Sequence, residues 1–60
     1  MKLVMKETQE PAVVGEVYPD FRGDSHTLEG GREPLHENST GRVFTDKGEF
    51  FPSVIGMEWV

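Results

Sequence analysis

The sequence contains no cysteine among its 60 residues. Disulfide bonds and thiolate zinc sites, two common ways to stabilise a chain this short, are therefore excluded. A domain of this length buries only about 60% of the surface that its unfolded chain exposes. The chain must rely on a compact apolar core, with self-association as a further source of stability.

Long apolar runs are also lacking. No stretch approaches the roughly 18 consecutive apolar residues that a membrane-spanning helix requires, and residues 1–7 lack the apolar segment of a signal peptide. We therefore expect residues 1–60 to form one small domain of a soluble, cytoplasmic protein that has no contact with membranes.

Basic residues are few, because six Lys and Arg face eleven Asp and Glu, for a formal net charge of -5. A negative surface repels phosphate backbones, which disfavours non-specific binding to nucleic acid. The excess of acids is explained either by solubility or by an acidic face that docks on a basic partner. The acids are spread along the chain, which argues against mimicry of DNA.

No segment has the pattern of a helix of ordinary length. The apolar residues include seven valines, four phenylalanines, one tyrosine and one tryptophan, and these types favour strands. Alternating or short apolar segments occur at 2–6, 12–18, 25–29, 41–45, 49–52 and 55–60. We interpret the chain as a fold of five short strands with tight turns, in which residues 32–40 form the longest loop.

Two proline and glycine positions mark expected breaks in this pattern. Pro19 is expected to end the strand over 12–18, because proline has no N–H to donate to a neighbouring strand. The pair Gly30-Gly31 is expected to form a turn or a bulge.

The segment around 46–48 predicts a hairpin. Three residues that end in glycine suit a loop whose last residue is left-handed. The resulting register pairs Thr45 with Glu49, Phe44 with Phe50, and Val43 with Phe51. The hairpin then carries apolar side chains on both faces. One face belongs to the core, and the other is either covered or exposed for a partner.

The segment Gly48-Glu49-Phe50-Phe51-Pro52-Ser53-Val54, followed by a strand that ends in Trp59-Val60, resembles the end of SH3-like barrels. In that family a strand ends in Phe-Pro-Ser, a single 3₁₀ turn follows, and a last short strand closes the barrel. The resemblance implies an all-β fold: a small five-stranded SH3-like barrel with a short 3₁₀ turn near Pro52–Val54. The acidic stretch that builds the peptide groove of SH3 domains has no clear counterpart, so polyproline binding is not implied.

A second resemblance covers about two-thirds of the chain. The segments Asp20–Leu28 and Gly41–Phe44, together with the Phe-Phe-Pro-Ser-Val ending, look like short uncharacterised proteins of bacteriophages and prophages. The resemblance implies a bacterial or viral cytoplasmic setting and no particular activity.

Some short motifs match known functional sequences, but for each of them we favour a structural interpretation. The tripeptide Arg22-Gly23-Asp24 matches the integrin-binding sequence, but it suits a turn in which Asp24 bonds the following amides. The segment Gly23-Asp24-Ser25-His26 echoes the Gly-Asp-Ser block of some esterases, yet the adjacent side chains of Ser25 and His26 on a strand point to opposite faces and should not meet. We therefore expect no enzyme.

Cofactor and metal motifs are weak. His26 and His36 lie ten residues apart and, without cysteine, form no recognised ligand spacing. Gly30-Gly31 lacks the lysine and the following helix of a phosphate loop, and Asn38-Ser39-Thr40 is a glycosylation pattern only in a secreted chain. We expect neither a metal nor a cofactor.

The aromatic residues carry most of the functional information. The hairpin cannot bury all of its aromatic side chains on one face, so some need cover from a loop, a second copy or a target. Aromatic residues and arginine dominate the energetics of protein interfaces, and the same types can stack nucleic-acid bases. Because the chain is acidic, we predict a non-enzymatic interaction module that binds another protein of the host or the phage. A second copy of the chain, forming a homodimer, is a further candidate partner. The alternative function is that of a small nucleic-acid-binding barrel. The predicted partner-binding residues are Tyr18, Phe21, Arg22, Arg42, Phe44 and Phe50.

Overall fold

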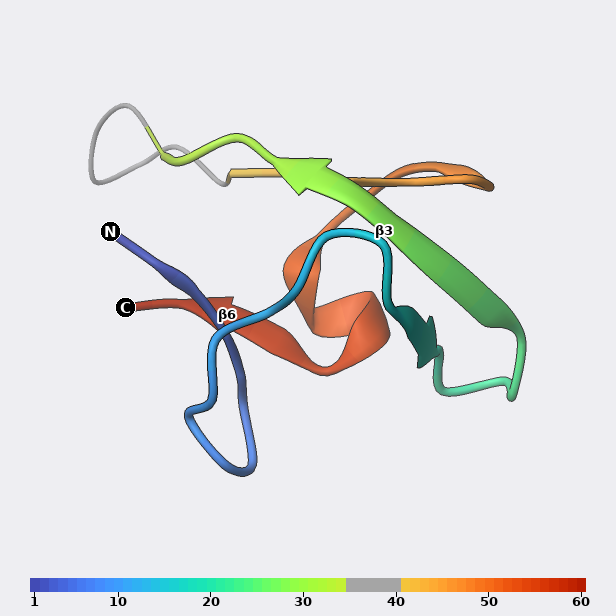
Figure 1. Cartoon of the computed structure of the whole chain (residues 1–60), viewed down its shortest axis with the longest axis horizontal. Helices are drawn as coiled ribbons and strands as arrows, with labels where there is room; N and C mark the ends of the chain where they lie inside the picture. The colour runs from blue at the N-terminus through green and yellow to red at the C-terminus, as the bar shows by residue number, and fades with distance from the viewer. Residues whose placement is uncertain (35–40) are drawn as a thin grey trace.

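The computed structural model describes residues 1–34 and 41–60, which form six strands and one 3₁₀ helix (Figure 1). The elements in chain order are β1 (Leu3–Met5), β2 (Val17–Pro19), β3 (Ser25–Gly31), β4 (Val43–Thr45), β5 (Gly48–Phe50), η1 (Pro52–Ile55) and β6 (Met57–Trp59). The predicted all-β class is confirmed. Each of the six predicted segments contributes a strand, so the count is one above the five expected. Within the described residues, no helix is long and apolar enough to cross a membrane.

The strands form two antiparallel sheets. β1 pairs with β6, and backbone bonds between Lys2 and Val60 extend this pairing, so the N- and C-terminal ends lie side by side (Figure 1). The second sheet has the strand order β2-β3-β4-β5. Because η1 follows β5 and precedes β6, it joins the two sheets.

The strand expected over 12–18 forms only at its C-terminal end. Gly15 has a φ of 95° and makes a turn, and its N–H donates to the Leu28 carbonyl over 2.8 Å. β2 ends at Pro19, as predicted, and Pro19 is its last residue, paired with Ser25 of β3. Proline is tolerated there since β2 is the edge of its sheet, where a missing N–H leaves no neighbour unsatisfied.

Gly30 and Gly31 are paired residues of β3 that directly follow a β-bulge. A bulge is one of the two predicted outcomes. Leu28 lies opposite Thr45, whereas Gly30 lies opposite Phe44, so the register shifts by one residue between them. At Gly31 a side chain would lie 3.3 Å from the Trp59 ring. Glycine therefore allows β3 to approach the β1–β6 sheet closely.

The β4–β5 hairpin has a two-residue loop, Asp46-Lys47, and not the predicted three-residue loop. The Lys47 N–H donates to Thr45 Oγ over 3.1 Å, which closes the turn one residue earlier. The predicted register is consequently wrong by one residue: Thr45 pairs with Gly48, Phe44 with Glu49, and Val43 with Phe50. Phe44 and Phe50 thus lie on opposite faces of the hairpin, because side chains alternate along a strand.

The core lies between the two sheets. Its buried cluster consists of one residue each from β3, β4, η1 and β6: Leu28, Val43, Ile55 and Met57. Partly buried side chains surround this cluster, among them Leu3, Met5, Ala12, Tyr18, Phe50 and Val54. Residues from all six strands and from η1 therefore depend on one small apolar centre.

The 3₁₀ turn predicted near Pro52–Val54 is confirmed as η1. Pro52 is its first residue, where proline suits a helix because its fixed φ fits and no N–H is required. The Gly56 N–H donates to the Ser53 carbonyl at its end. Pro52 and Ile55 are buried, so η1 presents these two residues to the core.

Shortening Val43 tests the importance of this core. Val43 is fully buried in the cluster, and Val43→Ala should lower the free energy of unfolding by about 2 kcal/mol, since two methyl groups are lost and a cavity remains. Val14 is exposed, and the matched Val14→Ala should change it by less than about 0.5 kcal/mol. Urea unfolding measures both values. Equal values for the two variants would contradict the placement of the core.

Candidate binding surface

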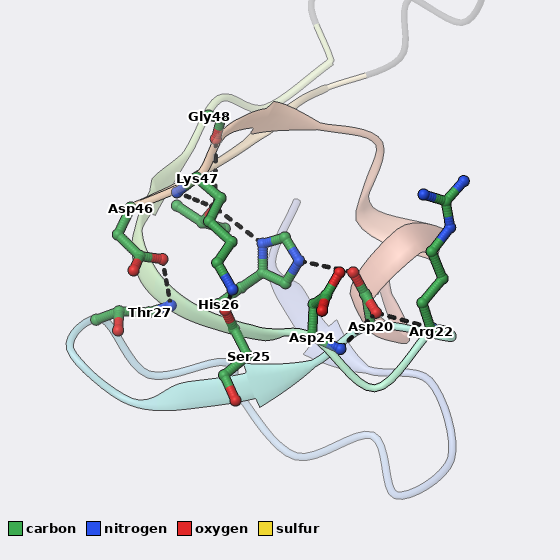
Figure 2. Close-up of polar contacts among 10 residues, drawn as sticks. Asp20, Arg22, Asp24, Ser25, His26, Thr27, Asp46, Lys47 and Gly48 are labelled. Atoms are coloured by element: carbon green, nitrogen blue, oxygen red, sulfur yellow. Dashed lines mark hydrogen bonds and ion pairs between the residues drawn. The ribbon is translucent and has the colours of Figure 1, made fainter.

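A buried histidine connects three parts of the chain. His26 on β3 is only 2% exposed. Its Nε2 lies 2.9 Å from Asp20 Oδ2, and its Nδ1 lies 3.1 Å from Thr45 Oγ (Figure 2). The Phe50 ring meets the imidazole edge-on at 4.8 Å between centroids. His26 thus links the turn after β2 to the β4–β5 hairpin.

The hydrogen-bond partners define where the imidazole proton lies. An ionised carboxylate can only accept, so Nε2–H donates to Asp20. Nδ1 shares a hydrogen bond with Thr45 Oγ, and the Thr45 hydroxyl also donates to the Gly48 carbonyl over 3.4 Å. Thr45 Oγ in turn accepts the Lys47 N–H. In the described part of the chain, no buried side-chain nitrogen or oxygen lacks a partner. This network is therefore satisfied and rigid.

Asp20 shapes the turn over residues 20–24. Its Oδ1 accepts the N–H groups of Arg22 (2.8 Å) and Asp24 (3.0 Å), as Figure 2 shows. The hydrogen bond from His26 lowers the pKa of the Asp20 carboxyl, and the two backbone donors lower it further, against the opposing effect of desolvation. The turn expected at Arg22-Gly23-Asp24 is confirmed, but the carboxylate that bonds its amides belongs to Asp20 and not to Asp24.

Asp20, His26 and Thr45 are residue types of a hydrolytic triad, but their placement does not suit that chemistry. A hydroxyl nucleophile must reach its substrate, and Thr45 is 4% exposed with both imidazole nitrogens already bonded. Ser25 is exposed whereas His26 is buried, so these neighbours point apart as predicted. The network accordingly stabilises the fold and offers no accessible nucleophile.

Metal ligands do not gather in the described ranges, 1–34 and 41–60, where no group of three or more His, Asp or Glu side chains could hold an ion. His36, the Asn38-Ser39-Thr40 pattern and most of the long loop predicted over 32–40 lie outside the described residues.

Two shallow depressions adjoin on the surface beside η1. The first is lined by Asp20, Phe21, Arg22, Phe50 and Val54, and the second by Arg32, Arg42, Glu49, Phe50, Phe51 and Val54. Phe50 and Val54 line both, so the depressions form one continuous region. We call these nine residues the aromatic–arginine surface.

Two phenylalanine rings on this surface are exposed. Phe21 is 78% and Phe51 48% exposed. The Arg42 guanidinium lies 3.9 Å from the centroid of the Phe51 ring, and that of Arg22 lies 5.5 Å from the Phe21 ring. Each ring is attracted to a cation through its π face. The Arg22 side chain points away from the His26 network (Figure 2).

Strand pairing brings the second depression together. Arg42 and Phe51 follow the pair Val43–Phe50 in the hairpin register, and the Arg32 N–H donates to the Arg42 carbonyl over 2.8 Å. Three neighbouring strand segments therefore place these side chains on the outer face. Glu49 Oε1 lies 3.4 Å from Arg32 Nη2 and 3.8 Å from Arg42 Nε.

The charge of this surface differs from that of the whole chain. All three arginines of the sequence lie on it, against two acids, Asp20 and Glu49, which leaves a formal charge of +1 in a protein of net charge -5. Asp20 is bonded to His26, and Glu49 is shared by two arginines. The local potential is consequently set by the guanidinium groups.

Four of the six predicted partner-binding residues line the surface, namely Phe21, Arg22, Arg42 and Phe50. Tyr18 lies elsewhere, against the core, where its hydroxyl accepts the Val13 N–H over 2.9 Å. Phe44 is half-buried on the same face of β4 as Arg42 but lines neither depression.

The predicted set lacks the other five residues of the surface, namely Asp20, Arg32, Glu49, Phe51 and Val54. For Phe51 the cause is the hairpin register, because the predicted pairing placed it opposite buried Val43. Comparisons of the chain with protein-family models, with curated proteins and with solved structures found no match. Function is therefore inferred from this surface.

The lowered pKa of Asp20 makes a pH dependence testable. A carboxyl whose folded-state pKa lies below its ordinary value of 3.8 stabilises the fold above that pH, and this contribution is lost as the pH falls through the folded-state pKa. Asp20→Asn should therefore destabilise the protein at neutral pH and lose less stability than the wild type on acidification below about pH 4.

Urea unfolding between neutral and acidic pH measures this effect. Asp24→Asn, an exposed neighbour, is the matched control and should retain the wild-type acid dependence. An Asp20→Asn variant with an unchanged acid profile would contradict the role assigned to the carboxylate.

Proposed function

We propose that this chain is a non-enzymatic interaction module that binds another protein through the aromatic–arginine surface. The exposed Phe21 and Phe51 rings, each beside an arginine, carry the proposal. Exposed aromatic groups of this size stay in water at a free-energy cost that burial against a partner removes. Aromatic residues and arginine are also the types that contribute most to binding at protein interfaces.

We further propose that the two sheets belong to a small SH3-like barrel. The chain order supports this: the first strand pairs with the last, β3, β4 and β5 form a meander, and η1 leads from β5 to β6. A 3₁₀ turn at that point is what the resemblance around Phe51-Pro52-Ser53 implies. In this proposal both sheets close around the core cluster of Leu28, Val43, Ile55 and Met57.

The proposed setting is the cytoplasm of a bacterium or of a phage-infected cell, with a host or phage protein as the partner. This rests on the resemblance to short bacteriophage and prophage proteins. A second copy of the chain is a further partner to test, since a domain of this size gains stability from self-association.

A small nucleic-acid-binding barrel is the second candidate function. Arg42 stacked at 3.9 Å on Phe51 favours it, because such pairs can stack unpaired bases. The net charge of -5 argues against it. Titration of single-stranded oligonucleotide at low salt, where electrostatic affinity is largest, separates the two functions.

The combined substitution Phe21→Ser and Phe51→Ser tests the protein-binding proposal. Both side chains are exposed, so the variant should remain folded by circular dichroism. Its affinity for the captured partner should fall about tenfold or more, since hot-spot residues each contribute over 1 kcal/mol. The double variant Val14→Ser and Val17→Ser, which alters exposed apolar residues elsewhere, is the matched control.

Affinity capture with the wild-type protein identifies the partner, and surface plasmon resonance then compares the variants. Sedimentation equilibrium reports self-association of the same proteins. A partner retained equally by wild type and by the phenylalanine variant would refute the proposed surface.

A further inference from the structure

We infer that the aromatic–arginine surface binds an extended acidic segment of its partner, in which carboxylates flank an apolar side chain. This inference rests on the proposed function and specifies the chemistry of the ligand. It reverses the expectation that an acidic face of this protein docks on a basic partner.

Charge is distributed unevenly between this surface and the rest of the protein. The surface carries a formal charge of +1 from its three arginines and two acids, whereas the protein as a whole carries -5. The remaining surface is therefore strongly negative and repels an acidic ligand. An acidic segment is consequently steered to the arginines and away from other faces, as complementary potentials orient protein partners.

Arg32 and Arg42 have N–H donors available for a ligand. The Arg32 side chain is 64% exposed, and its described ion pair is the 3.4 Å contact with Glu49. The Arg42 Nε lies 3.8 Å from the same oxygen, which is too long for a hydrogen bond. A guanidinium offers five N–H groups in a fork that matches a carboxylate. Because a single glutamate oxygen is shared between the two arginines, their remaining N–H donors can bind a second carboxylate.

An apolar floor lies between the arginines. Phe50 and Val54 line both depressions and so lie between Arg22 on one side and Arg32 with Arg42 on the other. An apolar side chain can pack on this floor, with Phe21 and Phe51 as exposed rims. Acidic side chains before and after it then reach the arginines at either end.

A nucleic acid would offer negative charge as well, but the observations favour a peptide. A polyanion with a charge on every unit is repelled by the rest of this acidic protein. The apolar floor also suits a leucine-like side chain better than a phosphate. Tighter binding of an oligonucleotide than of the acidic peptide would therefore oppose the inference.

Titration of the ¹⁵N-labelled full chain with short blocked peptides tests the inference. The probe is Ser-Glu-Leu-Glu-Ser, and the matched controls replace both glutamates by glutamine or by lysine. The acidic peptide should shift the amide resonances of Arg32, Arg42 and Phe51. It should bind about fivefold more tightly than the glutamine peptide at low salt, since each exposed ion pair contributes up to about 1 kcal/mol. The difference should shrink as salt is added.

Charge variants sharpen this test. The double variant Arg32→Gln and Arg42→Gln should lose the preference for the acidic peptide, whereas Lys2→Gln with Lys6→Gln removes the same charge elsewhere and should keep it. Glu49→Gln should raise the affinity for the acidic peptide, because the competing carboxylate is gone. Amide dispersion in the same spectra confirms that each variant is folded.

The outcomes separate the two proposals. Equal binding of the acidic and glutamine peptides at these amides overturns the inference and leaves the proposed function in place. Tighter binding of oligothymidylate overturns it in favour of nucleic acid. Concentration-dependent shifts of these amides without peptide overturn it in favour of a second copy. If no peptide shifts them, the inference fails, and the partner-capture experiment decides the proposed function independently.

Discussion

The hydrogen bonds of His26 hold together segments that no disulfide connects. The imidazole bonds Asp20 in the turn after β2 and Thr45 in the β4–β5 hairpin, and Asp20 in turn bonds the amides that shape the turn. A buried polar group is costly unless it is bonded, so each member keeps the others in place. The positions of Phe21 and Arg22, which project from this turn, depend on the same network. A residue buried in the core therefore determines the geometry of an exposed surface.

The hairpin register is the second constraint. A shift of one residue moves every side chain of a strand to the opposite face. With Val43 opposite Phe50, the inner face completes the core and the outer face presents Arg42 beside Phe51. The other register would bring Phe51 inward and expose Phe50 instead. The two-residue turn, in which Thr45 Oγ accepts the Lys47 N–H, is thus tied to the register that leaves Phe51 the more exposed of the two rings.

Much of the fold could be predicted from local pattern. The strand positions, the bulge option at Gly30-Gly31 and the 3₁₀ turn at Pro52 follow from alternation, glycine and proline, which act within a few residues. That Pro19 can still pair within β2 depends on β2 being an edge strand, which is a property of the sheet. Of the six predicted binding residues, Phe21, Arg22, Arg42 and Phe50 line the proposed surface, whereas Tyr18 packs against the core and Phe44 lines neither depression. Phe51 was not predicted.

The amino-acid sequence by itself determined the all-β class, the dependence on an apolar core without disulfides, and the supply of aromatic and arginine residues. These depend on composition and on short-range periodicity. Only the tertiary structure decided that the three arginines share one surface of an acidic protein, and that Glu49 lies between two of them. The arginines lie ten residues apart along the chain. Their proximity arises from strand pairing and from the His26 network, which are interactions between distant segments.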